Sequence, residues 1–580
     1  MAISLSPNFS RRSQSLKQRR LKRLGLFSLG GLSALVTALA TALPLAAAEK
    51  ISFVYGPFYR SLSIQSLEKF ATTGEVNPDL AFYFWIAKVD EAAKAKFREA
   101  LVKRAEIDPL LPSQFFYSDI GEDLLTRMGR YIGSPRGING MYALRSTLIL
   151  STLDPEGMSL LSILRNYPTD IWVNLENLLI LRRTIDRVVE ATTYFTNELK
   201  QQAAQEASHT PPVDFAQLPD LRQTGPFGVD SQRWQLTDAS RNRQFYVDVY
   251  RPQQWRSGQA PVLIFSHGLS SRPEDFARAA EHMASYGYVV ALPQHPGSDH
   301  LQAQALKTGL SRQVFLTSEF IDRPQDISYV IDELEWRNLS EFEGRLNLQS
   351  VGVAGHSFGG YGVMAVAGAT IDFEFLEEEC KRLAYPNTSL LLSCRALSLP
   401  RQEYNFRDDR VTAVFAANPV NYSLFGPEGL AKIQIPVMIG SGSYDPAAPA
   451  VFEQARSFPS LTTPFKYLAL AEGQAHVDFS QLDAGVTQAI NSATHLTLPA
   501  PDLIHDYASA LRLAFFEVHL LDNPDYRPYL QSSYAAYLSR DQQFKLLLIS
   551  AASDPALKQA IAEWQAENPP IALPESWTTQ

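Results

Sequence analysis

The stretch VGVAGHSFGGYG, at residues 351–362, decides the fold. An apolar run leads into a Gly-x-Ser-x-Gly pattern centred on Ser357, and more small residues follow. Small residues on both sides of a serine permit a strained turn between a strand and a helix. Such a turn lifts the hydroxyl above the sheet and places the positive end of the helix beneath it. The alternative is a glycine-rich corner where a helix packs closely on a sheet, so other residues must decide.

Short apolar and β-branched runs surround this stretch, and helical patterns such as Pro273–Tyr286 and Pro324–Trp336 separate most of them. The runs, in chain order, are FYVDVYRP, PVLIFSHG, YVVALPQHP, SVGVAGHS, VTAVFAANPV, IPVMIGSGSYD and FKYLALAEG. Apolar runs of this length with helical crossovers predict a mostly parallel sheet covered by helices on both faces. Ligand sites in such sheets form at the carboxyl ends of the strands.

Two further residues follow later strands at that edge. Asp445 ends IPVMIGSGSYD, and His476 comes shortly after FKYLALAEG. A serine hydroxyl is a weak nucleophile unless a histidine takes its proton, and the histidine needs a carboxylate to hold its tautomer. We therefore predict that Ser357, Asp445 and His476 form a catalytic triad in the chain order serine, acid, histidine.

Other residues compete for two of these roles. Asp445 also fits a residue that caps a turn, and Asp478 is a rival acid, although its short spacing from His476 disfavours contact with the imidazole. Three more histidines follow: His495, His505 and His519. The last of them is embedded in an apolar helical run, which favours a position in the core.

An acyl-transfer site also needs hydrogen-bond donors for the developing oxyanion. One donor is expected to be the backbone N–H after the nucleophile, that of Phe358. The loop after PVLIFSHG contains His267-Gly268-Leu269, and we assign the N–H of Leu269 as the second donor. The alternative for this loop is a simple turn.

The first 48 residues have the pattern of an export signal. A basic leader precedes an uncharged run over 24–48, which ends in three alanines before Glu49. A signal peptidase accepts this small-residue pattern, so we predict cleavage after Ala48 and export to the periplasm or the cell exterior. The alternative is an uncleaved membrane anchor, because the run can cross a hydrocarbon core of ~30 Å. The arginine pair at 11–12 leaves twin-arginine export open.

The charge of the chain excludes some partners. The formal charge is −9, and removal of the seven basic residues of the leader makes it −16. A chain this acidic is a poor candidate for binding nucleic acid or for electrostatic attachment to anionic membranes. No partner protein is identifiable from the sequence.

Changes in the hydrophobic pattern and composition along the chain predict its domains. We expect an all-helical accessory domain over 49–200, a polar, proline-bearing linker over 201–225, the α/β domain over 226–530 and a C-terminal helical extension over 531–580. Within the first domain, apolar periodicity predicts helices over 78–103, 142–153 and 172–200. We find no catalytic constellation there.

The connection over 369–410, between the helix after Ser357 and the next strand, is long for this fold. Loops longer than ~12–15 residues are often lids or binding segments. This one is partly amphipathic and holds both cysteines of the chain, Cys380 and Cys394, which can pair in an exported protein. We expect a lid braced by a disulfide. Two free buried thiols, and a surface insertion without a gating role, are the alternatives.

The motifs FSHGLSS, LPQHPGSD and GHSFGG together resemble the α/β-hydrolase superfamily, and within it the platelet-activating-factor acetylhydrolase and dienelactone-hydrolase-like branch. The resemblance covers about residues 225–530. It implies the α/β-hydrolase fold, carboxylic-ester hydrolysis, serine chemistry without cofactor or metal, and an oxyanion pair at Leu269 and Phe358. The whole chain also resembles a cyanobacterial family of exported α/β-hydrolases with unassigned substrates.

One departure from the acetylhydrolases concerns the acid of the triad. In that family the acid follows the strand after the nucleophile helix, where this chain has Asn418 in VTAVFAANPV. The acid here comes one strand later, at Asp445. The reaction type is unaffected, but the case for a phospholipid substrate is weaker.

The expected function is hydrolysis of a small-molecule or lipid carboxylic ester through a covalent acyl-enzyme, with transient contact to lipid. A peptidase or a polyester hydrolase would use the same triad, and pocket shape decides among them. A binding protein that retains the fold without activity is the alternative from another class. The presence of all three separated triad residues argues against it.

Overall fold

The computed structural model describes residues 47–382, 386–476, 497–569 and 571. Residues 1–46 of the predicted leader, Asp478 and His495 lie outside the described residues. Within the described ranges, no helix is long and apolar enough to cross a membrane.

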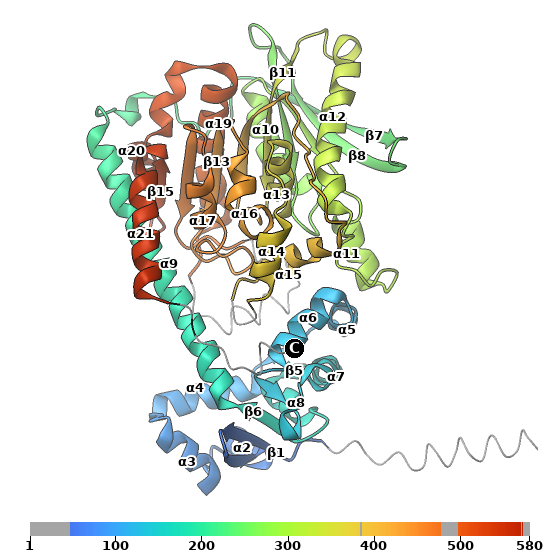
Figure 1. Ribbon diagram of the computed structural model, residues 1–580, viewed down its shortest axis with the longest axis vertical. Helices are drawn as coiled ribbons and strands as arrows, with labels where there is room; N and C mark the ends of the chain where they lie inside the picture. Colours follow the sequence, from blue (N-terminus) through green and yellow to red (C-terminus); the bar gives the residue numbers. More distant parts are fainter. Residues whose placement is uncertain (1–46, 383–385, 477–496, 570, 572–580) are drawn as a thin grey trace, which may run out of the picture.

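A central sheet has the strand order β15-β14-β13-β12-β11-β9-β10-β8-β7 (Figure 1). Its strands are β7 (Val229–Asp238), β8 (Arg243–Pro252), β9 (Ala260–Ser266), β10 (Val289–Pro293), β11 (Leu346–His356), β12 (Val411–Ala417), β13 (Val437–Gly442), β14 (Lys466–Ala471) and β15 (Leu546–Ser550). The strands from β14 to β10 in this order are parallel, and antiparallel strands complete both edges. Each apolar run quoted above forms a strand of this sheet, and the strands from β14 to β10 are parallel. The predicted mostly parallel sheet is therefore confirmed.

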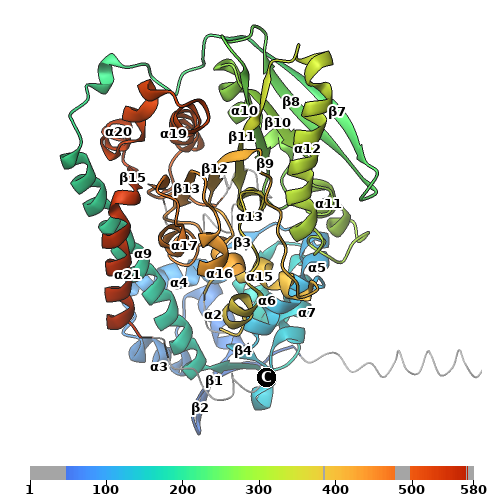
Figure 2. The ribbon, with the colours of Figure 1, turned by 45° about the horizontal axis from the view of Figure 1, so that its top comes forward.

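Helices cover both faces of this sheet (Figures 1 and 2). In β9, Val262 and Ile264 belong to the core shared with α12 (Glu319–Glu341) and α13 (Phe358–Val366). Leu263 and Phe265 belong to the core on the other face, with α10 (Ala277–Ser285) and α19 (Pro501–Leu521). Alternate side chains of a strand point to opposite faces, so a strand buried on both faces is apolar throughout.

The remaining helices of this part follow the strands or extend the chain beyond them. They are α11 (His300–Lys307), α14 (Phe373–Cys380), α15 (Leu390–Ser393), α16 (Tyr422–Ala431), α17 (Gln454–Ser460), α20 (Ser532–Leu538) and α21 (Asp554–Glu567). The segment expected to be a C-terminal helical extension thus also contains β15, which pairs antiparallel with β14. The expectation of helix alone was wrong there.

The N-terminal part is mostly helical, but the expectation that it is all-helical was wrong. Its helices are α2 (Ile64–Thr73), α3 (Pro78–Ile86), α4 (Glu91–Val102), α5 (Leu110–Phe116), α6 (Asp119–Met128), α7 (Met141–Thr152), α8 (Leu160–Arg165) and α9 (Leu175–His209). A small sheet of order β2-β1-β6-β4 joins β1 (Lys50–Tyr55), β2 (Phe58–Ser63), β4 (Ile132–Gly133) and β6 (Ile171–Asn174). A second pair joins β3 (Arg104–Ala105) and β5 (Met158–Ser159).

The differences have local causes. The run ISFVYG is β-branched and aromatic and turns back at Gly56, whose φ of 53° suits glycine, so it forms one arm of a hairpin. The expected helix over 78–103 is two helices, and Asp90 caps the second by accepting a hydrogen bond from the N–H of Ala93 at 2.7 Å.

The long helix α9 belongs partly to the part of the molecule built on the central sheet. It continues to His209, so the first part of the predicted linker is helical. Its residues Phe195, Leu199 and Ala203 lie in the core of the central sheet. Glu206 accepts a hydrogen bond from the N–H of Ser550, so α9 lies beside β15 (Figure 2).

The N-terminal part also packs beneath the carboxyl edge of the sheet, where α14 and α15 lie (Figure 1). Asp123 of α6 pairs with Arg395 just after α15, at 2.6 Å. Asp108, just before α5, pairs with Lys307 of α11 at 3.3 Å. The N-terminal part is thus joined to the segments that follow the strand ends.

Candidate active site

Ser357 lies at the sharp turn between β11 and α13. Its φ is 57° and its ψ is −118°, a backbone conformation that is strained for a residue other than glycine. The neighbouring glycines permit the turn: a Cβ on Gly355 would lie 2.3 Å from the carbonyl oxygen of Gly359, and one on Gly359 would lie 2.1 Å from that of Ser266. The small residues of the motif therefore serve close packing and the raised serine at once.

The structure brings Ser357, His476 and Asp445 together. His476 Nε2 lies 2.7 Å from Ser357 Oγ, and His476 Nδ1 lies 2.7 Å from Asp445 Oδ2. Ser357 and Asp445 are buried, and His476 is partly buried. These distances join the three side chains in the continuous hydrogen-bond chain that a serine nucleophile needs.

Asn418 completes the environment of the carboxylate. Its Nδ2 donates to Asp445 Oδ2 at 2.6 Å, while the N–H groups of Ala447 and Ala448 donate to Asp445 Oδ1 at 2.9 and 2.8 Å. The residue that stands where the acetylhydrolases have their acid therefore supports the acid in its new position. From the sequence, Asn418 was recognised only as a departure from the acetylhydrolase pattern. Its contact with Asp445 was not predicted.

His356, the residue before Ser357, was also not predicted. Its Nε2 lies 2.9 Å from the carbonyl oxygen of His476. Burial, followed by the nearby His476, lowers the pKa of His356 to about 3, so the ring is neutral and Nε2 carries its single proton toward that carbonyl. His356 thus holds in place the backbone of the loop that carries His476.

The two expected oxyanion donors lie around the serine. A Cβ on Gly268 would lie 3.3 Å from Ser357 Cβ, so the loop that carries Leu269 lies against Ser357. Among the described residues, neither the N–H of Leu269 nor that of Phe358 has a hydrogen-bond acceptor. The ring of Phe358 is fully buried and packs on Phe320 at 5.0 Å between centroids, which fixes the start of α13.

The rival histidines lie elsewhere. His505 and His519 are both in α19, where His505 Nε2 lies 3.2 Å from Ser509 Oγ and His519 Nε2 lies 3.1 Å from the hydroxyl of Tyr467. Burial lowers the pKa of each imidazole to about 4, which is consistent with neutral packing roles. In the described ranges, no group of histidine, cysteine, aspartate and glutamate could hold a metal ion.

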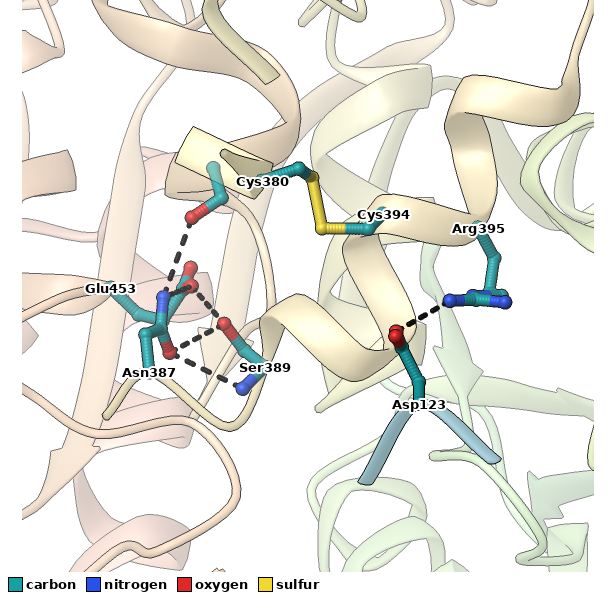
Figure 3. Close-up of a disulfide and its surroundings, with 8 residues drawn as sticks. Asp123, Cys380, Asn387, Ser389, Cys394, Arg395 and Glu453 are labelled. Carbon is teal, nitrogen blue, oxygen red and sulfur yellow. Dashed lines mark hydrogen bonds and ion pairs between the residues drawn. A yellow bond between two sulfur atoms is a disulfide. The ribbon is translucent and has the colours of Figure 1, made fainter. Parts of the chain in front are cut away.

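The insertion over 369–410 lies against the loop that carries Asp445. Cys380 and Cys394 form a disulfide, and Glu453, just before α17, receives hydrogen bonds from Asn387 Nδ2 at 3.2 Å and Ser389 Oγ at 2.5 Å (Figure 3). The hydroxyl of Thr388 donates to the carbonyl of Pro446, the residue after the acid.

Two family models match separate parts of the chain. A family described as alpha/beta hydrolase of unknown function (DUF1400) matches residues 47–174, which is the region before α9. The family platelet-activating factor acetylhydrolase, isoform II, matches residues 230–314, from β7 past α11. The second match includes the loop of His267, Gly268 and Leu269, and neither match includes Ser357, Asp445 or His476. No curated protein matches the chain.

The sheet order, the raised turn at its carboxyl edge and the two family matches agree with one another. The chain has the α/β-hydrolase fold, and parts of it are similar to an α/β-hydrolase family and to the platelet-activating-factor acetylhydrolase family.

Proposed function

We propose that this hydrolase is a serine esterase that cleaves carboxylic esters, of lipids or of smaller acyl compounds. The observation that carries the proposal is the unbroken hydrogen-bond chain from Ser357 Oγ through His476 to Asp445. Its position at the carboxyl edge of the parallel sheet, on a strained turn, supports a role in chemistry because ligands bind at this edge. The acetylhydrolase match supports an ester as the substrate.

In the proposed mechanism, His476 Nε2 takes the proton from Ser357 Oγ as the oxygen attacks the ester carbonyl. Asp445 accepts a hydrogen bond from His476 Nδ1–H and stabilises the imidazolium that forms. The N–H groups of Leu269 and Phe358 donate to the oxyanion of the tetrahedral intermediate. His476 then returns the proton to the leaving alcohol, which gives the acyl-enzyme, and water releases the acid by the same route.

The proposal includes the location of the enzyme. The leader supports export and the acidic mature chain disfavours anionic membranes, so we propose that the enzyme meets its ester substrate outside the cytoplasm with only transient lipid contact.

Substitution of the nucleophile tests the mechanism. Ser357→Ala should lower kcat for a short-chain p-nitrophenyl ester by about 10⁴-fold or more, because the residual rate comes from binding and the oxyanion donors alone. Circular dichroism should show an unchanged fold, and a fluorophosphonate probe should label the wild type but not the variant. Equal turnover by the two proteins would exclude the triad.

Two alternatives remain distinguishable. A peptidase or polyester hydrolase would cleave peptides or polyesters faster than acyl esters in a substrate screen with the same serine variant as control. A binding protein without activity would fail to react quickly with the fluorophosphonate, because only an activated serine does so.

A further inference from the structure

Arg323 of α12 lies fully buried beneath the loop that carries Leu269. Its Nη1 donates to the carbonyl oxygen of His267 at 2.5 Å, and its Nη2 lies 3.4 Å from that of Gly268. The guanidinium carbon also lies 4.6 Å from the centroid of the Phe358 ring. One side chain therefore contacts Phe358, which carries one expected oxyanion donor, and the two residues before Leu269, which carries the other.

The carbonyl of Gly268 and the N–H of Leu269 belong to the same peptide unit. A hydrogen bond donated to the carbonyl fixes the plane of that unit and polarises its N–H, because hydrogen bonds in a chain strengthen one another. Arg323 reaches two successive carbonyls with a rigid, planar fork of donors. It can therefore fix two consecutive peptide planes of the oxyanion loop, which a single-point donor cannot do.

His267 contributes a second donor to the same carbonyl. Its Nε2 accepts a hydrogen bond from the N–H of His295 at 3.1 Å, and its Nδ1 lies 2.8 Å from the carbonyl oxygen of Gly268. Burial and the nearby Arg323 lower the pKa of His267 well below its ordinary value, so the ring is neutral. Since Nε2 accepts, the single proton is on Nδ1 and points to Gly268.

Buried acids balance the charge of Arg323. Its Nε donates to Ser298 Oγ at 2.9 Å and lies 3.6 Å from Glu319 Oε2, and Ser298 Oγ in turn donates to Glu319. Burial lowers the pKa of Arg323 to about 10, so it stays protonated at neutral pH. Arg243 binds Glu319 and Asp326 at 2.8 Å each, on the far side of the same ionic cluster.

Buried ion pairs are weak evidence for stability, because desolvation offsets their attraction. The direction of the donors is more informative. On the basis of the proposed function, we infer that Arg323 is a positioning residue for the oxyanion hole, which orients the N–H of Leu269 toward the substrate carbonyl and polarises it through the Gly268 carbonyl.

The test replaces Arg323 and compares it with a matched arginine. Arg323→Lys keeps the charge but loses the fork. With a p-nitrophenyl ester, kcat should fall about 10- to 100-fold with KM within about twofold, because the lost interaction acts in the transition state. Arg243→Lys is the control: it disturbs the same acids, but among the described residues Arg243 makes no hydrogen bond to the oxyanion loop. Its kcat should stay within about threefold of the wild type.

A second measurement does not depend on the choice of substrate. The inhibition constant of a trifluoromethyl ketone, which forms a tetrahedral adduct with a serine, should rise in Arg323→Lys by the same factor as kcat/KM falls. A merely structural role would lower activity in proportion to the folded fraction and leave this constant unchanged. Urea unfolding of each variant gives that fraction.

If Arg323→Lys does not fold, Ser298→Ala provides the second variant, because it removes the acceptor of Arg323 Nε and keeps every charge. It should lower kcat by about three- to tenfold at unchanged KM. Equal kcat losses in the Arg323 and Arg243 variants, or an unchanged kcat in Ser298→Ala, would overturn the role of Arg323 alone. Ester turnover in the wild type that does not require Ser357 would instead overturn the proposed function.

Discussion

His356 and Asn418 show how the candidate triad is supported by residues outside it. His356 donates to the backbone of His476, and Asn418 donates to the same oxygen of Asp445 that faces the imidazole. Gln474 in turn donates to Asn418 Oδ1 at 3.3 Å, which fixes the orientation of the amide. These contacts set where the base and the acid lie, so their loss should affect rate more than fold.

Asn418→Ala should lower kcat/KM about tenfold, because Asp445 loses a charge-assisted hydrogen bond and gains freedom to leave the imidazole. Steady-state kinetics with a p-nitrophenyl ester measures this. Asn405→Ala, at an exposed loop position, is the control and should match the wild type. An Asn418 variant with full activity would show that the backbone N–H groups of Ala447 and Ala448 hold the acid without help.

The environment of His282, in α10, predicts how the free energy of unfolding depends on pH. It is buried and donates to the carbonyl of Leu221 at 2.9 Å, and burial lowers its pKa to about 4. The unfolded chain binds this proton near pH 6.5. Stability from the neutral ring is therefore complete above about pH 6.5 and is lost as the pH falls toward 4.

His282→Gln keeps a donor for Leu221 and removes the titration. The free energy of unfolding should then fall less steeply between pH 6.5 and 4, by up to about 1.4 kcal/mol per pH unit. Urea unfolding across this range measures the slope. His209→Gln, at the exposed end of α9, should leave the slope as in the wild type, and an unaltered slope in the His282 variant would contradict the prediction.

At the scale of elements, the insertion braces the loop that carries Asp445. The disulfide fixes α14 against the turn after α15, and between them Thr388, Asn387 and Ser389 reach the Asp445–Glu453 segment. The insertion is thus joined to the acid loop by several hydrogen bonds. Reduction of the disulfide should loosen this support.

The variant that replaces Cys380 and Cys394 by serine should lose about 3 kcal/mol of unfolding free energy, the cost expected for opening a loop of this length. Its kcat/KM should also fall, because Thr388 no longer holds the acid loop firmly. Urea unfolding and ester kinetics measure both effects, with the reduced wild type as a matched control. Two free thiols in the folded, non-reduced wild type would exclude the disulfide.

The parallel strands could be predicted because each is a continuous apolar run beside a turn, and chain order then placed Ser357, Asp445 and His476 at one edge. The strand β15 could not be placed, because its pairing with β14 depends on residues far apart in the sequence. Arg323 and His356 were missed for another reason. They bind the backbone carbonyls of His267 and His476, and no motif in the sequence indicates a contact between a side chain and a backbone carbonyl.

At the scale of the whole molecule, the N-terminal part is attached to the segments around the candidate site. Asp108 and Asp123 bind Lys307 and Arg395, which follow strand ends or belong to the insertion. The family match over 47–174 ends where α9 begins, whereas α9 itself contributes to the core of the central sheet. We propose that residues 49–174 form a cap over the site and that α9 belongs with the hydrolase.

Deletion of residues 49–174, which retains α9, should leave a folded enzyme with a changed ratio of long-chain to short-chain ester turnover. The ratio changes because a cap restricts long acyl chains more than short ones. Kinetics with esters of increasing chain length measures it, and Ser357→Ala in the deleted chain is the control. An unchanged ratio would show that the N-terminal part does not limit access.

The position of β15 beside α9 determines when the central sheet can be completed during synthesis of the chain. The central sheet gains its last strand only from residues 546–550, and the apolar face of α9, made more than half a chain earlier, lies against the sheet that this strand completes. Until those residues emerge, β14 has an open edge that other chains can pair with. A nascent chain therefore cannot reach its native core from its N-terminus onward, and any product that ends before residue 546 should aggregate rather than fold.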